Sequence, residues 1–278
     1  MDLPIYHAPA RGILTATSGF IREAGFTHSL TPARNCTFGC TYCYVPTMGL
    51  YGGLKQDDWR RWGQFTTFKQ NAPELLQREL RPNQIIYCSP LVDPYQPAEE
   101  QEQMMPRLLE VLINNPPATF VIQTRGPLIL RDLDQLKALN ASVSFSLTTD
   151  DDHIRRLYEP HCATFETRLA TIRTLRAAGI RVHATLAPIL PCNPANLATK
   201  ALDGTGLDLV GDPLHTRSEK PRGATTREAA YRIAQHHNHL QWFDSDFMRG
   251  VYCTIASVAN ERGLQFRTGP AGFKLLTQ

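Results

Sequence analysis

Residues 36–43 read Cys-Thr-Phe-Gly-Cys-Thr-Tyr-Cys, which places Cys36, Cys40 and Cys43 in the spacing C-x3-C-x2-C. One short loop with this spacing can present three thiolates to a four-iron cluster and leave the fourth iron without a protein ligand. Structural zinc takes four ligands, commonly as two closely spaced pairs, and the ten residues after Cys43 hold no further Cys or His. The loop therefore predicts an iron-sulfur centre, with a zinc knuckle or three unrelated thiols as the alternatives.

Length and composition fit one large α/β domain. The chain has 278 residues, of which 42% are hydrophobic, and α/β barrels commonly reach this length as a single domain. No apolar run approaches the ~18 residues of a membrane span, and the start of the chain lacks the pattern of a leader peptide. Seven cysteines, three of them in one loop, suit a reducing compartment. We therefore expect a cytoplasmic protein without a membrane segment.

The charge balance leaves the substrate class open. A net charge of +3 is below that of a dedicated nucleic-acid-binding domain. Small basic groups occur at 60–61, at 155–156 and at Lys220, Arg222 and Arg227, and such groups are usually solvated surface.

Short apolar runs alternate with amphipathic stretches after the cysteine loop, a pattern typical of βαβ units. It predicts strands at 85–88, 119–123, 142–147 and 181–189, a weaker strand at 207–210, and helices at 99–114, 131–139 and 165–178. Right-handed connections should curl these units into a partial (β/α)6 TIM-type barrel. We expect an extended lead-in over residues 1–28, a core over about 28–215, and a helical cap over 216–278 with helices at 226–239 and 246–262, all in one domain.

Polar residues follow the predicted strands, where ligands bind in such sheets. Cys88 ends the first of these strands and Asp93 follows it, Arg125 follows the second, and Ser146 lies in the third. The carboxyl ends of the strands are therefore the expected site.

The cysteine loop resembles the signature of the radical S-adenosylmethionine (SAM) superfamily, in which an aromatic residue also precedes the last cysteine, as Tyr42 does here. Other stretches resemble the spore photoproduct lyase branch and its photolyase-like relatives; they are 30–36 (Leu-Thr-Pro-Ala-Arg-Asn-Cys), 92–99 (Val-Asp-Pro-Tyr-Gln-Pro-Ala-Glu), Thr124-Arg125, 130–132, Glu159-Pro160, Arg168 and 187–191. The resemblance implies a 4Fe-4S cluster and SAM as cofactors, with an external electron donor of the flavodoxin or ferredoxin type. SAM would occupy the open iron and be cleaved to a 5′-deoxyadenosyl radical that abstracts hydrogen from the substrate.

The same resemblance implies roles for three cofactor-binding residues. Tyr42 would contact adenine, or it simply packs. Arg125 stands where the lyases carry a Lys that meets the SAM carboxylate, which Arg can bind bidentately; the alternative is an ion pair with Asp132 or Asp150. Ser146 would contact the ribose or amino group of SAM.

Cys88 lies in the region where spore photoproduct lyases carry a cysteine that returns a hydrogen atom to the product radical. The resemblance makes Cys88 the candidate catalytic residue. The alternative is a buried packing role, which is common for free cysteine.

Some residues differ from the pattern of this branch, and several cysteines and histidines have no predicted functional role. Asn35 replaces the usual Gly before Cys36, which changes the backbone freedom of the loop, and no β-hairpin that could part DNA strands is evident. Cys162, Cys192 and Cys253 lack metal-like spacing. His236 and His239 could bind a metal as an i, i+3 pair, but a solvent-facing cluster is the simpler interpretation.

The sequence thus predicts a radical SAM enzyme related to spore photoproduct lyase, with nucleic-acid repair or modification as one candidate reaction. The alternative is a non-catalytic iron-sulfur or zinc module that binds nucleic acid or senses redox state.

Overall fold

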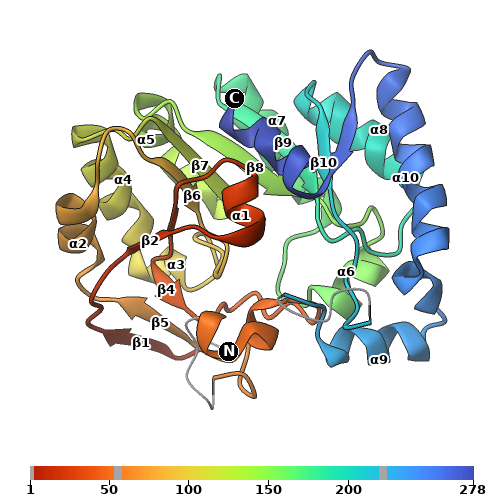
Figure 1. Cartoon of the computed structure of the whole chain (residues 1–278), viewed down its shortest axis with the longest axis horizontal. Helices are drawn as coiled ribbons and strands as arrows, with labels where there is room; N and C mark the ends of the chain where they lie inside the picture. Colours follow the sequence, from red (N-terminus) through yellow and green to blue (C-terminus); the bar gives the residue numbers. More distant parts are fainter. Residues whose placement is uncertain (1–2, 53–57, 219–223) are drawn as a thin grey trace.

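The computed structural model describes residues 3–52, 58–218 and 224–278. Its main sheet contains six neighbouring parallel strands, β3 (His28–Leu30), β6 (Ile85–Cys88), β7 (Thr119–Thr124), β8 (Ser142–Ser146), β9 (Arg181–Leu186) and β10 (Leu209–Gly211). Short strands extend both edges: β2 (Leu14–Ala16) runs antiparallel to β3, and β11 (Phe266–Thr268) runs parallel to β10. The sheet curves without closing, so the expected partial TIM-type barrel is confirmed (Figure 1).

A small second sheet holds the segment that leads into the cysteine loop. Its order is β1 (Ile5–Ala8), β5 (Thr66–Lys69) and β4 (Ala33–Arg34). The lead-in over residues 1–28 is therefore more structured than expected, because it contributes β1, β2 and the short helix α1 (Gly19–Glu23). Since β4 ends at Arg34, the small sheet anchors the chain directly before Cys36.

Helices cover the outer face of the main sheet (Figure 1). They include α2 (Ala72–Glu79), α4 (Met104–Asn114), α5 (Leu133–Ala138), α7 (Phe165–Ala177) and α8 (Pro194–Thr205). Within the described ranges, no helix combines the length and the apolar character needed to cross a membrane.

The single helix expected at 99–114 is wrong, because the chain breaks at Gln103. That residue adopts a left-handed conformation (φ 53°) between α3 (Glu99–Glu102) and α4. The Glu99 carboxylate accepts hydrogen bonds from the backbone N–H groups of Met104 (3.1 Å) and Met105 (2.8 Å). A buried carboxylate thus satisfies the free donors of the new helix, as side-chain caps do. The expected helix at 131–139 is likewise divided, into the 3-10 helix η2 (Pro127–Asp132) and α5.

The C-terminal region contains the two expected helices, as α9 (Glu228–His236) and α10 (Ser245–Asn260). It also supplies β11, which the sequence did not predict, the 3-10 helix η3 (Leu240–Phe243), the short helix α11 (Gly269–Phe273) and the 3-10 helix η4 (Lys274–Thr277). Helix α10 packs on α8, so this region continues the outer layer of the barrel.

The two faces of the sheet differ in polarity. Successive strand residues point to opposite faces, and Ile86, Cys88, Ile122 and Val143 lie in the large apolar core with the leucines of α4. The inner face carries Tyr87 and Val121, which pack in a separate cluster with Phe26, Phe273 and Leu276. Because Phe26 precedes β3 and α1 contacts α11, this second cluster closes the barrel at the amino ends of the strands.

Toward the carboxyl ends the inner face becomes polar. Gln123 accepts hydrogen bonds from Tyr87 (2.8 Å) and Ser144 (2.6 Å) and donates to Ser146 (2.7 Å). Ser144 also shares a hydrogen bond of 2.5 Å with Thr185. These hydrogen bonds make the inner face polar at this end of the sheet.

Candidate active site

Asn35 sets the backbone turn that begins the cysteine loop. Its φ of 66° lies in the left-handed region, which glycine, and to a lesser degree Asn, adopts at low cost. The side-chain oxygen accepts hydrogen bonds from the backbone N–H of Cys36 (2.8 Å) and of Gly63 (3.2 Å). Asn35 therefore sets this left-handed turn and adds two hydrogen bonds that hold the loop.

Two glycines allow the cysteine loop to pack against the segment before β5. A Cβ atom at Gly63 would lie 2.6 Å from the Cα of Gly39. Both residues also have positive φ, 62° at Gly39 and 87° at Gly63. The path between Cys36 and Cys40 thus depends on the absence of side chains at both positions.

The three cysteines differ in surroundings. Cys36 and Cys40 are each 7% exposed, and Cys43 is half-buried. Burial raises the pKa of the Cys36 thiol well above its usual range and raises that of Cys43 to about 12. A hydrogen bond from Cys162 lowers the pKa of Cys40, burial opposes this shift, and the Arg125 cation adds to it. In the metal-free chain, Cys40 is therefore the thiol that ionises most readily of the three.

Glu159 is the centre of a buried ionic network behind the cysteine loop. One carboxylate oxygen accepts from Arg125 (2.5 Å), from the Tyr42 hydroxyl and from Thr148 (2.9 Å), and the other pairs with Arg168. Burial alone would raise the pKa of Glu159, but the cations of Arg168 and Arg125 lower it to about 2. The carboxylate is therefore ionised, and both of its oxygens are occupied.

Arg125 joins this network to the cysteine loop. Its guanidinium carbon lies 5.7 Å from the centre of the Tyr42 ring, and Nη1 donates to the Tyr42 hydroxyl and lies 3.6 Å from the Cys40 sulfur. The backbone N–H of Arg125 donates to Asp93 (2.9 Å), whose other carboxylate oxygen accepts from Thr124 (2.6 Å). Asp93 thus fixes the strand end that carries the guanidinium.

Arg125 forms neither of the two ion pairs that were the alternatives to a SAM contact. Asp132 pairs with Arg131 (2.7 Å), and Asp150 accepts from Asn196 (2.6 Å). The ion pair is made with Glu159 instead, because that residue follows α6 (Asp152–Tyr158) at the same end of the barrel.

The segment after α6 forms a platform, residues 158–163, on which the cysteine loop rests. Thr41 donates its backbone N–H to the carbonyl of Tyr158 (2.9 Å). Arg155 Nη1 donates to the carbonyl of Cys162 (2.9 Å), and its Nε pairs with Asp152 (3.0 Å). The basic pair at 155–156 therefore contributes a structural cation at Arg155, which is itself buried.

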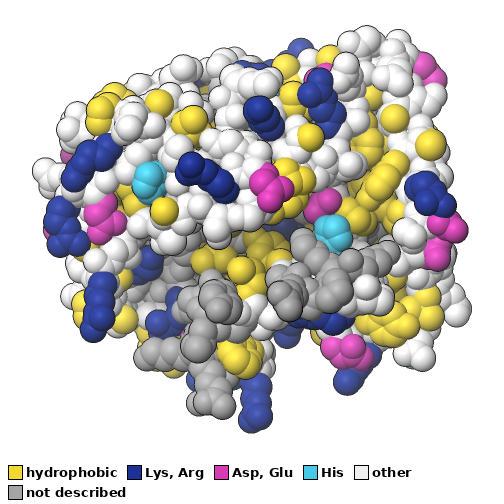
Figure 2. All heavy atoms as spheres, viewed as in Figure 1, with side chains coloured by type: hydrophobic (Ala, Val, Ile, Leu, Met, Phe, Trp, Pro, Cys, Tyr) yellow, Lys and Arg dark blue, Asp and Glu magenta, His cyan; other side chains and the backbone are white. Residues whose placement is uncertain are grey.

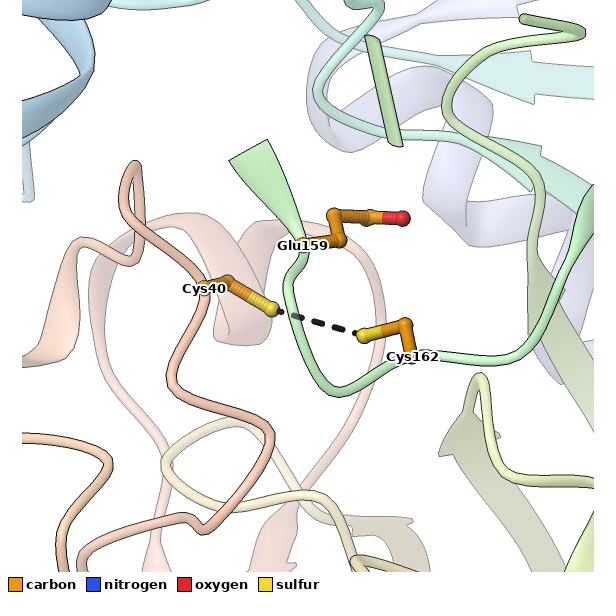
Figure 3. A group of neighbouring side chains, drawn as sticks. All are labelled: Cys40, Glu159 and Cys162. Carbon is orange, nitrogen blue, oxygen red and sulfur yellow. Dashed lines mark hydrogen bonds between the residues drawn. The ribbon is translucent and has the colours of Figure 1, made fainter. Parts of the chain in front are cut away.

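Cys162 brings a fourth sulfur to the site. Its Sγ lies 3.9 Å from the Sγ of Cys40, and the two side chains point toward each other with Glu159 beside them (Figure 3). The ligand atoms of Cys40, Glu159 and Cys162 all lie within 4.8 Å of one another, and in the part of the chain that the structure describes no such group contains Cys36 or Cys43. Sequence spacing could not reveal this contact, because 122 residues separate the two cysteines.

Ser146 and Cys88 lie on opposite faces of the sheet. Ser146 faces the polar interior, where its hydroxyl accepts a hydrogen bond from Gln123. Cys88 is 0% exposed and belongs to the core on the helix side of β6, the face opposite Tyr87. This placement favours the packing role of Cys88 over hydrogen donation into the interior.

The C-terminal region also touches the cysteine loop. Thr47, in the 3-10 helix η1 (Val45–Gly52) that follows Cys43, donates to the carbonyl of Thr225 (3.1 Å) and accepts from its N–H (3.3 Å). Arg227 follows two residues later, whereas Lys220 and Arg222 lie outside the described residues.

Two further cysteines and a group of three histidines belong to other parts of the fold. Cys192 is half-buried before α8, and Cys253 is exposed on α10. The rings of His236, His237 and His239 are neighbours at the end of α9, but no metal-type group of the described residues includes them.

Comparisons with known proteins agree with this geometry. Residues 30–194 match the radical SAM superfamily. The chain is 27% identical over 157 residues to an uncharacterized protein of Methanocaldococcus jannaschii, covering 56% of this chain and 58% of that protein. It is 29% identical over 174 residues to an uncharacterized protein of Mycobacterium tuberculosis, covering 60% of this chain and 50% of that protein. The match therefore spans only about half of the length of these relatives.

Solved structures share the fold. A spore photoproduct lyase variant with bound AdoMet and dinucleoside spore photoproduct superposes with a TM-score of 0.63 at 15% identity, covering 95% of this chain and 81% of that chain. Spore photoproduct lyase complexed with dinucleoside spore photoproduct gives a TM-score of 0.58 at 14% identity, covering 87% and 80%. With its cysteine loop at the carboxyl ends of a partial barrel and a family match over more than half its length, this chain belongs to the radical SAM superfamily.

Proposed function

We propose that Cys36, Cys40 and Cys43 hold a 4Fe-4S cluster to which SAM binds. The donor set fits the group, since three cysteine sulfurs of one buried loop are soft ligands of the kind that iron-sulfur centres take. The observation that carries the proposal is the contact of Arg125 with Cys40 at 3.6 Å. A guanidinium beside a ligand sulfur offsets the negative charge that three thiolates bring into a buried site.

When bound, the cluster and SAM supply the radical that abstracts hydrogen, and the chain supplies placement and exclusion of water. Arg125 would contact the SAM carboxylate. Glu159 would hold the Arg125 guanidinium in place, and Asp93 would hold the backbone that carries it. Tyr42 would pack against adenine with its hydroxyl held by Glu159. Ser146, oriented by Gln123, would contact the ribose or amino group. An external flavodoxin or ferredoxin would deliver the electron.

The substrate would enter at the carboxyl ends of the strands, because α1, α11 and η4 close the opposite end. The polar inner face formed by Gln123, Ser144 and Ser146 suits a substrate with hydrogen-bonding groups. Figure 2 shows the Lys and Arg side chains of the described residues spread over this view among acidic ones. We therefore propose hydrogen abstraction from a polar substrate, with damaged or modified nucleic acid as one candidate.

SAM cleavage tests this proposal directly. The chain is reconstituted with iron and sulfide without oxygen, then dithionite and SAM are added and 5′-deoxyadenosine is quantified by chromatography. We expect about four irons per chain and 5′-deoxyadenosine that the Cys40→Ala variant does not form. Cys192→Ala is the matched control and should retain both. A wild-type chain that holds zinc or no metal, or cleavage that survives Cys40→Ala, would contradict the ligand assignment.

A further inference from the structure

We propose that Cys162 is a positioning residue that donates its S–H group to the Cys40 sulfur and thereby raises the reduction potential of the cluster. This inference rests on the proposed function, because it requires Cys40 to be a cluster ligand. It assigns a role to a cysteine that sequence spacing alone left without one.

The contact is close and its geometry is held from both sides. The two sulfurs lie 3.9 Å apart, and the Cys162 side chain is only 6% exposed. The backbone of Cys162 donates to the carbonyl of Glu159 (3.1 Å) and accepts from Arg155 (2.9 Å). The neighbouring carbonyl of Ala163 accepts from Arg168 Nε (3.1 Å). Cys162 is therefore directed at Cys40 by a clamped backbone.

The direction of the hydrogen bond follows from the charges. A cysteine bound to iron is a thiolate and carries no proton, so Cys40 can only accept. Cys162 lies near both that thiolate and the carboxylate of Glu159, within 4.8 Å of each ligand atom (Figure 3). A second thiolate there would add a buried negative charge beside two others, so Cys162 keeps its proton and donates.

A separate metal ion bound by Cys40, Glu159 and Cys162 fits the surroundings less well. Both oxygens of Glu159 already accept hydrogen bonds, from Arg125 and Tyr42 on one side and from Arg168 on the other. A divalent cation would have to displace these partners and lie next to two guanidinium groups, which Coulomb repulsion opposes. The trio is therefore a hydrogen-bonded group and not a second metal site.

A hydrogen bond to a ligand sulfur stabilises the cluster state with more negative charge. Reduction adds one electron, taken from an external donor, and no proton moves. Donors to cysteine ligands therefore make reduction easier, and hydrogen bonds to the sulfurs are among the factors that set iron-sulfur potentials. Cys40 has two such neighbours, Arg125 at 3.6 Å and Cys162 at 3.9 Å.

The test is a potentiometric titration of reconstituted full-length chains without SAM, followed by the electron paramagnetic resonance signal of the reduced cluster. We expect Cys162→Ala to bind as much iron as wild type and to have a lower midpoint potential. Cys162→Ser retains a hydroxyl donor and should fall between the two. Cys192→Ala is the control for loss of a cysteine and should match wild type.

The outcomes separate this inference from the proposed function. If the wild-type chain forms no four-iron cluster, the proposed function fails first. If wild type forms the cluster and Cys162→Ala has the same midpoint potential, the positioning role is refuted and the ligand assignment stands. Loss of iron in Cys162→Ala would also overturn the inference, because it would make Cys162 a ligand.

Discussion

Removing the charge of the buried Glu159 carboxylate should lower the free energy of unfolding strongly. Replacing it with Gln in the metal-free chain preserves shape but leaves Arg168, 2% exposed, and Arg125 with no anion between them. Breaking one partner out of a buried ion pair typically costs ~3–5 kcal/mol. Two cations share this carboxylate, so we expect Glu159→Gln to lower the free energy of unfolding by about 4 kcal/mol.

Urea denaturation followed by circular dichroism under reducing conditions measures this loss as a lower midpoint at an unchanged slope. The matched control is Asp246→Asn, which breaks an exposed ion pair with Arg249 (side chains 76% and 71% exposed). Exposed pairs contribute ~0.2–1 kcal/mol, so the control midpoint should barely move. If Glu159→Gln costs no more than Asp246→Asn, the network does not stabilise the fold as argued.

A double variant isolates the interaction itself. Arg168→Met alone removes the cation that lies deepest, and Glu159→Gln with Arg168→Met removes both charges of the pair. Residues in one ionic network are coupled by ~0.5–3 kcal/mol, so the double variant should lose less stability than the two single variants together. Strict additivity would show that the carboxylate and the guanidinium act independently.

Three further predictions concern acid stability, the loop backbone and the buried thiol. Burial lowers the pKa of His183 to about 4, so the neutral ring stabilises the fold fully above pH ~6.5, and about 3 kcal/mol of the free energy of unfolding is lost as the pH falls to 4. The free energy of unfolding of His183→Gln, measured between pH 7 and pH 4, should therefore decrease less than that of wild type. An equal decrease would show that His183 does not cause the loss of stability in acid. Gly63→Ala places a methyl group 2.6 Å from the backbone of the cysteine loop at a residue with positive φ, so this variant should incorporate less iron than wild type. The control is Gly250→Ala, whose methyl group meets open space and should stabilise its helix by up to about 1 kcal/mol. Equal iron content in the two variants would show that the loop tolerates the methyl group. Because Cys88 lies on the helix side of β6, Cys88→Ala should cleave SAM like wild type and, once a substrate is known, release the same product; an altered product would restore the hydrogen-donor role.

Much of the fold was accessible from the sequence because it depends on local patterns. Strand and helix periodicities placed five of the parallel strands, among them β6 and β9. Errors occurred where a distant or capping contact decided the backbone. The turn at Gln103 depends on the Glu99 carboxylate, and β11 is a three-residue edge strand whose side chains are mostly exposed. Neither leaves a periodic signal.

The cysteine trio and most of the central strands and helices could be predicted from the sequence, because each is encoded by residues that lie close together in the chain. What surrounds the cysteine loop becomes apparent only in the folded chain. Glu159 reaches Tyr42 across 117 positions and Cys162 reaches Cys40 across 122. Such contacts form because parallel strands bring all of their carboxyl ends to one side of the barrel. Their buried charges must then find partners wherever the chain places them.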